Sequence, residues 1–238
     1  MNIVAVILAR AGSKGIPKKN LAMLGDRPLV AHMIGHALNA GVEMDVVLST
    51  ESEDIASVGR KWGAQVPFMR PSHLAEDTVE SLPVVQHAVN CMEQIHNKEY
   101  AIIVYLQPNA PLCRPQDIKD CVDTLQKQPD AESCVTITGV QTHPFKMKRL
   151  VDGRRVINYI DQGFEDMRPR QKLPPVYRRA GSVYASRRNV VMEKGTLVGD
   201  PCLGVEVPVE TAIDIDLPMD LELARLLYCK RSEKGASE

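Results

Sequence analysis

The chain alternates short apolar runs with segments whose apolar residues recur at helical spacing. The strand-like runs cover residues 2–9, 45–50, 100–107 and 133–140. The segments with helical spacing cover residues 27–41, 51–63, 82–96 and 114–128. Residues 2–9 are apolar almost throughout, which is typical of a strand buried on both faces. The alternation predicts an α/β fold with a mainly parallel sheet, whose ligands lie beyond the carboxyl ends of the strands.

Length and composition are consistent with one domain over residues 1–238. The 238 residues are 44% apolar, enough for one sizeable core, and the formal net charge is −1. This charge balance argues against a nucleic acid polymer as partner and leaves room for a local basic pocket. The amino terminus has no signal-peptide pattern, and no apolar run approaches the roughly 20 residues of a membrane span. We expect a soluble, cytoplasmic protein that does not bind membranes.

The six cysteines are scattered along the chain without a metal-binding or redox spacing. We therefore expect them to be buried thiols. This leaves basic and acidic side chains as the candidate chemistry.

A basic loop follows the first predicted strand. Residues 11–20 combine two glycines, a serine and a proline with Lys14, Lys18 and Lys19, and Arg10 precedes them. The loop matches neither GxxxxGK[ST] nor GxGxxG, so it is not a usual P-loop or dinucleotide fingerprint. At the end of a first α/β strand, however, glycine N–H groups and lysines can hold anionic oxygens. The loop therefore predicts a phosphate site.

Residues 145–188 break the alternation of strands and helices. This segment holds twelve basic residues against four acidic ones. It could be a solvated basic surface, an arm that covers a ligand with carboxylate and phosphate groups, or a contact to a second subunit. Periodicity leaves these three alternatives open.

A second group of charges lies near the carboxyl terminus, in the segment "ETAIDIDLPMDLELARLL". If this segment is extended, Asp214 and Asp216 point to one face. Two such carboxylates suit Mg²⁺ bound to a triphosphate, and Pro218 is well placed to begin a terminal helix. The alternative is that one aspartate only caps that helix.

Five segments together resemble the acylneuraminate cytidylyltransferase family, which comprises CMP-sialic acid synthetases and their relatives. They are "ILARAGSKGIPKKNL", "FMRPSHLAEDT", "YLQPNAPL", "RPRQKLPPVYRRAGSVY" and "IDIDLPMDLELA", and their order spans essentially the whole chain. The resemblance implies a Rossmann-like nucleotide-binding fold with a dimerisation insertion at about residues 145–188. It also implies an enzyme that transfers a cytidylyl group from CTP to a nonulosonic acid sugar and releases pyrophosphate.

The resemblance also implies roles for individual residues. Arg10, Lys19 and Asp214 are the expected catalytic residues, with Arg10 and Lys19 offsetting charge on the departing pyrophosphate. The expected CTP contacts are Ala11, Gly12, Ser13, Lys14, Asn20, Arg70 and Ser81. The expected sugar contacts are Gln107, Lys146, Arg170 and Tyr184. Asp214 and Asp216 are expected to bind Mg²⁺, with Mn²⁺ as an alternative.

Several alternatives remain open at the level of sequence. Ser81 could cap a helix, and Tyr184 could be a core residue of a strand. The family usually carries Pro-Asn-Gly at residues 179–181 and Gln-Pro-Thr-Ser-Pro at 107–111, and this chain departs from both. Loss of an amide near the sugar weighs against N-acetylneuraminate, so legionaminic, pseudaminic, deaminated or amino-Kdo-type sugars stay open. A non-catalytic nucleotide-binding regulatory or scaffold protein of the same fold is the alternative function.

Overall fold

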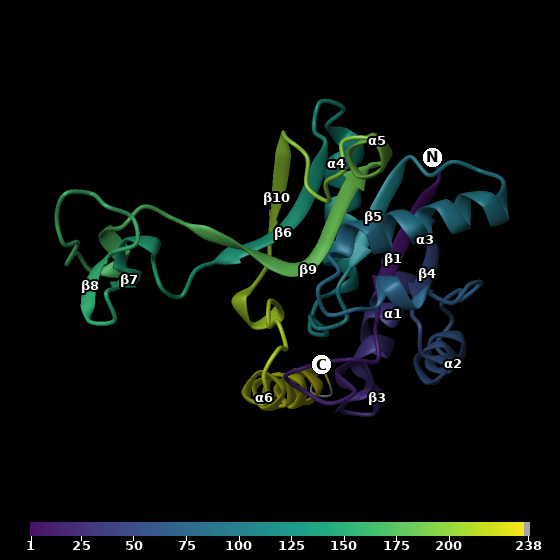
Figure 1. The fold of residues 1–238 in the computed structure, drawn as a ribbon, viewed down its shortest axis with the longest axis horizontal. Coiled ribbons are helices and arrows are strands. Elements are labelled where there is room, and N and C mark those ends of the chain that lie inside the picture. Colours follow the sequence, from purple (N-terminus) through teal and green to yellow (C-terminus); the bar gives the residue numbers. More distant parts are fainter. Residues whose placement is uncertain (236–238) are drawn as a thin grey trace.

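The computed structural model describes residues 1–235 and is built on one six-stranded sheet (Figure 1). The strands are β1 (Ile3–Leu8), β4 (Asp45–Ser49), β5 (Ile102–Leu106), β6 (Ser133–Gly139), β9 (Tyr177–Arg187) and β10 (Cys202–Glu206). Their order across the sheet is β10-β6-β9-β5-β1-β4. The β1–β4, β1–β5 and β10–β6 pairs are parallel, whereas β9 is antiparallel to both β5 and β6. The predicted mainly parallel α/β sheet is therefore confirmed.

The first four helices lie at the positions that the apolar spacing predicted and the last begins at Pro218 as expected, whereas the short helix at residues 188–192 was not predicted. They are α1 (Leu29–Leu38), α2 (Glu53–Lys61), α3 (Ser81–His96), α4 (Pro115–Lys127), α5 (Arg188–Met192) and α6 (Pro218–Gly235). Five short 3₁₀ helices are η1 (Lys19–Leu21), η2 (Ser72–Leu74), η3 (Pro144–Lys146), η4 (Arg170–Lys172) and η5 (Val209–Thr211). Two small hairpins, β2 (Met23–Leu24) with β3 (Arg27–Pro28) and β7 (Lys148–Val151) with β8 (Arg155–Asn158), complete the fold.

Alternating residues of β1 are buried on opposite faces of the sheet. Ile3 and Ile7 pack in a core cluster with residues of α1 and α4, whereas Val4 and Val6 pack in a second cluster with residues of α3. Because both faces are covered, the strand has no polar side, which explains its continuous apolar run. This burial fixes the carboxyl end of β1 and hence the start of the basic loop.

Helix α6 packs at the carboxyl-terminal edge of the sheet. Leu221 and Ala224 of α6 share a third core cluster with Leu24, Ile16 and Ile215. Ile16 comes from the basic loop and Ile215 from the aspartate segment, so burial of these two side chains brings the two charged segments together.

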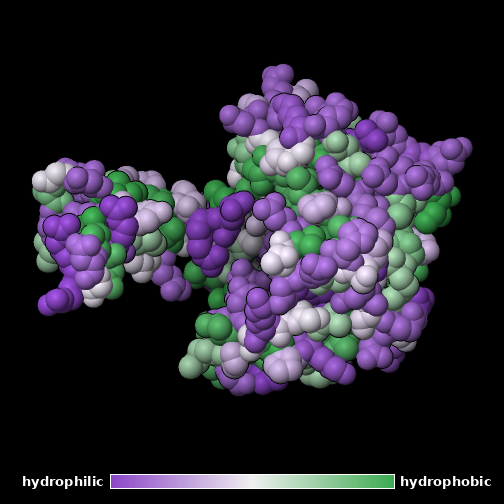
Figure 2. All heavy atoms as spheres, in the orientation of Figure 1, coloured by the Kyte–Doolittle hydropathy of each residue, from purple (hydrophilic) through white to green (hydrophobic). Residues whose placement is uncertain are grey.

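The basic segment predicted at 145–188 divides into two parts. Its last residues form β9 and the start of α5, and β9 is a central strand of the sheet. The preceding residues form an arm that carries the β7–β8 hairpin and stands well away from the body (Figures 1 and 2). Three arginines lie in β9, at 178, 179 and 187, and a fourth follows it at 188. These charged residues hid the buried positions of the strand from the sequence pattern.

The cysteines are only partly buried. Cys113, Cys121 and Cys134 are buried and Cys91 is half-buried, but Cys202 and Cys229 are exposed, so the prediction of buried thiols is wrong for these last two. Within residues 1–235, no helix combines the length and apolar character that a membrane-spanning helix requires.

Candidate active site

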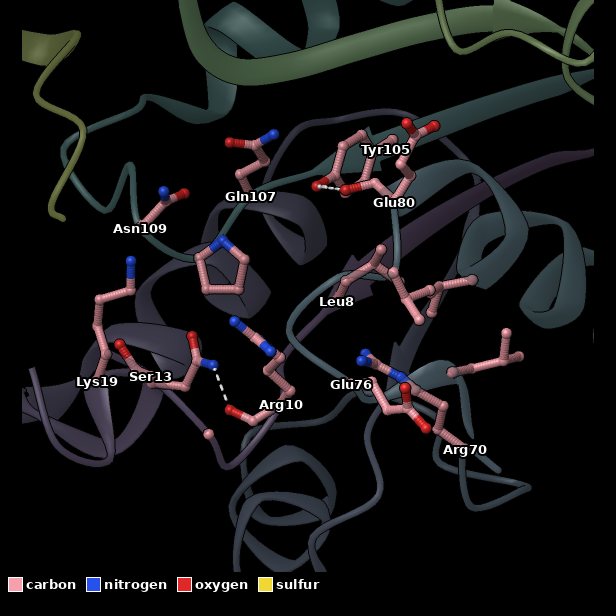
Figure 3. A pocket seen from close by; sticks show the side chains of 17 residues that line it. Leu8, Arg10, Ser13, Lys19, Arg70, Glu76, Glu80, Tyr105, Gln107 and Asn109 are labelled. Atoms are coloured by element: carbon pink, nitrogen blue, oxygen red, sulfur yellow. Dashed lines mark hydrogen bonds between the residues drawn. The ribbon is translucent and has the colours of Figure 1, made fainter. Parts of the chain in front are cut away.

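A pocket lies at the carboxyl ends of β1 and β5 and is lined by residues far apart in the sequence (Figure 3). Eight of the residues predicted from the sequence line it: Arg10, Gly12, Ser13, Lys19, Asn20, Arg70, Ser81 and Gln107. The fold thus brings the basic loop, the residues expected near cytidine and one residue expected near the sugar to a single site.

The basic loop is held in place by a hydrogen bond within the loop and by close packing on the aspartate segment. Asn20 is buried and its Nδ2 donates to the carbonyl oxygen of Arg10 at 2.9 Å, which closes the loop on itself. A Cβ on Gly15 would lie 2.1 Å from the carbonyl oxygen of Asp216, so only glycine permits this close approach. The loop therefore rests directly on the segment that carries the two aspartates.

Lys19 joins these two segments through its ammonium group. Its Nζ donates to the carbonyl oxygen of Ile215 at 2.8 Å and to Oδ1 of Asp216 at 2.9 Å. The Lys19 side chain is only 16% exposed, so its charge is partly withdrawn from water and directed at the site. A fixed cation at this position can stabilise negative charge on a phosphate.

Carboxylates hold the other donors of the basic loop. Asp77 forms ion pairs with Arg10 and, at 3.3 Å, with Lys14, and these two cations hold the pKa of Asp77 below its usual range. The backbone N–H of Ala11 donates to Oε1 of Glu51 at 2.6 Å. These donors can therefore bind anionic oxygens, and the exposed pairs are weak enough to exchange for a ligand.

Arg70 reaches the pocket from a buried position. Its Nη2 donates to the carbonyl oxygen of Ser49 at 2.5 Å and its Nε to the Ser49 hydroxyl at 3.1 Å, at the end of β4. Burial lowers the pKa of Arg70, and Glu51, 3.9 Å from Nη1, opposes that shift. The guanidinium is thus held in one orientation at the pocket wall.

Ser81 contacts Tyr105 across the pocket. Its hydroxyl lies 3.0 Å from the Tyr105 hydroxyl, and burial raises the pKa of Tyr105 (Figure 3). The cap position of α3 is Glu80, which makes no side-chain capping bond. Ser81 therefore faces the site as the first residue of its helix, and the alternative role as the helix cap is wrong.

The aspartate segment is irregular rather than a strand, so the expected extended conformation is only partly correct. Asp214 is half-buried and its Oδ1 accepts from Nδ2 of Asn109 at 2.5 Å. Burial raises the pKa of Asp214, and the neighbouring Asp216 raises it further. Asp216 is paired with the Lys19 ammonium, whereas Asp214 accepts from the neutral amide of Asn109. The site therefore holds more negative charge at the pair than Lys19 alone balances.

Asp220, in the first turn of helix α6, binds the backbone that leads into the helix. Its Oδ2 accepts from the backbone N–H groups of Asp216 and Leu217, at 3.0 and 2.7 Å. The carboxylates of Asp214 and Asp216 are hydrogen-bonded to Asn109 and Lys19, and within residues 1–235 neither accepts from a backbone N–H of α6, so the alternative that one of them merely caps the helix is wrong. Both carboxylates of the pair stay available for the site.

Seven predicted site residues lie outside the pocket lining: Ala11, Lys14, Lys146, Arg170, Tyr184, Asp214 and Asp216. Ala11 and Lys14 are exposed on the loop, and Lys146 and Arg170 are exposed on the arm, where Arg170 Nη2 donates to the carbonyl oxygen of Val140 at 2.7 Å. Tyr184 stacks on Tyr105 with ring centroids 5.5 Å apart, so it adjoins the pocket through that ring. The expected sugar contacts are therefore not all assembled by one chain.

Five polar residues at the site were not identified from the sequence: Glu76, Glu80, Tyr105 and Asn109 line the pocket, and Asp77 pairs with Arg10 and Lys14 beside it. Tyr105 and Asn109 stand at and just beyond the end of β5. Their position at the carboxyl end of a buried strand was a signal that could have identified them.

Comparisons with known proteins agree with this geometry. A sequence model of the family described as cytidylyltransferase matches residues 4–198. The chain is 29% identical over 228 residues to the CMP-N,N'-diacetyllegionaminic acid synthase of Legionella pneumophila, covering 95% of this chain and 96% of the relative. It is 30% identical over 229 residues to the pseudaminic acid cytidylyltransferase of Campylobacter jejuni, covering 96% and 97%.

A solved structure shares the fold. CMP:2-keto-3-deoxy-manno-octonic acid synthetase complexed with CTP superposes with a TM-score of 0.70 at 20% identity, covering 97% of this chain and all of that one. At this identity the likeness concerns the fold alone. The match over residues 4–198 shows that the chain belongs to the cytidylyltransferase family, in line with a pocket lined by the basic loop and with an aspartate pair joined to that loop through Lys19.

Proposed function

We propose that this protein transfers a cytidylyl group from CTP to the anomeric hydroxyl of a nonulosonic acid and releases pyrophosphate. The relatives named for legionaminic and pseudaminic acids match almost the whole chain, which supports this class of sugar. The observation that carries the proposal is the junction of Lys19 with Asp216, which brings the basic loop against the aspartate pair. A nucleotidyl transfer needs this combination of cationic donors and carboxylates at one place.

In this proposal the basic loop holds the triphosphate. The oxygens of the triphosphate replace Asp77 at Arg10, while Ser13 and Lys19 contact it from the loop. The cytidine lies towards Arg70 and Ser81. The sugar hydroxyl forms a bond to the α-phosphorus as the bond to the bridging oxygen breaks, and Arg10 and Lys19 stabilise the charge on the departing pyrophosphate.

Asp214 and Asp216 would hold Mg²⁺ or Mn²⁺. The donor set fits because carboxylate oxygens are hard ligands, and a cation would offset the burial and the neighbouring Asp216 charge that together raise the pKa of Asp214. Residues 1–235 contain no group of three or more His, Cys, Asp or Glu side chains placed for a metal. Mg²⁺ commonly uses one or two carboxylates together with water and substrate phosphates, and when bound it withdraws charge from the α-phosphate.

We also propose that the protein acts in the cytoplasm as a homodimer formed through the arm. The arm exposes large apolar side chains, namely Met147, Leu150, Val156, Tyr159, Ile160, Phe164 and Met167. A two-stranded hairpin is barely stable on its own in water, so a partner surface that covers these side chains would stabilise it. In such a dimer Lys146 and Arg170 could reach the partner's sugar site.

The test is an assay of pyrophosphate release with CTP, Mg²⁺ and a panel of nine-carbon and eight-carbon 2-keto acid sugars. We expect turnover with CTP and a nonulosonic acid, formation of the CMP-sugar by mass spectrometry, and much slower reaction with UTP or ATP. Tight CTP binding without turnover on any sugar acid would instead identify a nucleotide-binding scaffold or regulatory protein.

A further inference from the structure

The register of β9 places Arg179 and Tyr184 on the same face of the sheet. On β6 their partners are Ile137 and Val135, which are two residues apart and therefore point to one face. Residues 180–183 form a bulge in β9, which absorbs the extra length between the two pairs. The Arg179 guanidinium carbon consequently lies over the Tyr184 ring, 5.9 Å from its centroid.

This face continues into the pocket. Tyr184 pairs with Tyr105 across β5 and β9 and their rings stack, and Tyr105 lines the pocket together with Gln107, two residues further on. The stacked rings of Tyr105 and Tyr184 thus form a continuous aromatic surface, here called the floor. It begins in the pocket at Tyr105 and ends beneath the guanidinium of Arg179.

Asp214 stands at the edge of this floor. A Cβ on Gly181, in the β9 bulge, would lie 3.5 Å from Oδ2 of Asp214 and 3.9 Å from Oε1 of Gln107. Gly181 has a φ of +82°, which a glycine adopts without strain. The bulge therefore places Arg179 on the same short stretch of backbone that borders the expected reaction centre.

The Arg179 guanidinium has free donors. Within residues 1–235 it makes no hydrogen bond and no ion pair, and the residue is exposed. Its neighbour Arg178, by contrast, donates from Nη2 to the carbonyl oxygen of Ala212 at 2.8 Å. A planar guanidinium over a ring keeps its N–H edge available for two parallel bonds to a carboxylate.

We propose that Arg179 binds the carboxylate of the sugar acid from within the same chain and thereby selects acidic sugars. This inference rests on the proposed function, because it names a contact of that substrate. The carboxylate is the charged group common to 2-keto acid sugars, and it shares a carbon with the reacting hydroxyl. Lys146 and Arg170, predicted to face the sugar, lie on the arm of this chain, whereas Arg179 lies beside the pocket.

The test compares a sugar acid with its methyl ester in wild type, Arg179→Met and Arg179→Lys. The probe is N,N'-diacetyllegionaminic acid or pseudaminic acid, whichever gives turnover, and the ester is measured by its inhibition constant. Arg179→Met should raise KM for the acid about 10- to 100-fold, the usual effect of losing a charged hydrogen bond, with KM for CTP nearly unchanged. Arg179→Met should leave the inhibition constant of the methyl ester nearly unchanged. Arg179→Lys should retain part of the affinity for the acid that Arg179→Met loses.

Arg60→Met is the matched control, since Arg60 is an exposed arginine of α2 that lies outside both the arm and the pocket lining. CTP binding, measured by calorimetry, checks that each variant is folded. If an Arg179 variant does not fold, Arg179→Gln is measured in its place. If Arg179→Met weakens binding of the acid and of the ester equally, or leaves KM for the acid unchanged, the inference about Arg179 is wrong. The proposed function would still stand in that case, because it depends on turnover by the wild type. Absence of wild-type turnover with every sugar acid would refute both.

Discussion

Lys19 connects two segments that lie almost two hundred residues apart in the sequence, and it is the side chain on which the site depends most. Lys19→Ala removes the ammonium group that contacts Ile215 and Asp216. We expect turnover to fall about 10²- to 10³-fold, as when one preorganised donor to a developing charge is lost. Single-turnover pyrophosphate release measures the effect.

Lys18→Ala is the control for Lys19, because Lys18 is exposed in the same loop. The melting temperature of Lys19→Ala should fall by a few degrees at most, because the change removes two hydrogen bonds but no core side chain. Wild-type rates in Lys19→Ala would remove Lys19 from the phosphate site.

The Asp214 and Asp216 pair tests the metal. Asp214→Asn and Asp216→Asn should each lose most turnover, and a chelator should abolish turnover of the wild type, with recovery on addition of Mg²⁺ or Mn²⁺. Initial rates across a metal titration provide the measurement. A wild-type rate that is insensitive to chelator would exclude a required metal.

The same pair has a signature in stability that does not depend on activity. Burial and Asp216 raise the pKa of Asp214 above 3.8, so folding disfavours its charged form. This cost is absent below the unfolded pKa of 3.8 and fully present above the folded pKa. In metal-free buffer Asp214→Asn should therefore melt slightly higher than wild type at neutral pH, and the gain should vanish towards about pH 3. A lower melting temperature at neutral pH would contradict this.

At the scale of elements, Asp45 fastens the beginning of β4 to the segment before β5. Its carboxylate accepts from Lys98 and Tyr100, both at 2.7 Å, and from Gln65 at 2.9 Å. Burial alone would raise the pKa of Asp45, but these bonds together lower it to about 2. The ionised form is therefore favoured in the folded protein.

Asp45→Asn should lower the free energy of unfolding by about 1–2 kcal/mol near neutral pH. Because the folded pKa lies below the unfolded value, this contribution is present above about 3.8 and is lost as the pH falls to about 2. Urea unfolding of both proteins across this range measures it. Asp130→Asn, an exposed change elsewhere, is the control, and a pH-independent difference would show that the carboxylate charge is not the cause.

At the scale of the whole molecule, the arm decides the assembly. Leu150→Asp and Phe164→Asp each place a charge among the exposed apolar side chains of the arm, so we expect them to weaken the dimer. Sedimentation velocity should show a dimer for the wild type and a shift to monomer for the double variant. Activity should fall with the dimer, since the arm carries Lys146 and Arg170. A wild-type monomer with full activity would contradict the proposal.

The sequence alone was enough to identify the framework of this molecule. The strands β1, β4, β5 and β6 and helices α1 to α4 were predicted, because burial on two faces or on one helical face leaves a local periodic pattern. The basic loop and the paired aspartates were identified because their residue types stand close together in the sequence. The rule that ligands lie at the carboxyl ends of parallel strands predicted the place of the basic loop, whereas the shared site of the loop and the aspartates was implied by the family resemblance.

Tertiary structure decided what depends on distant partners. The position of β9 between β5 and β6 follows from pairing with strands about 40 to 85 residues away, and arginines at and just beyond its ends masked its buried centre. The partners of the aspartate pair, Asn109 for Asp214 and Lys19 for Asp216, likewise lie more than a hundred residues away in the sequence. The floor from Tyr105 to Arg179 could not be predicted from local periodicity either. It is created by a bulge in β9 and by pairing across three strands.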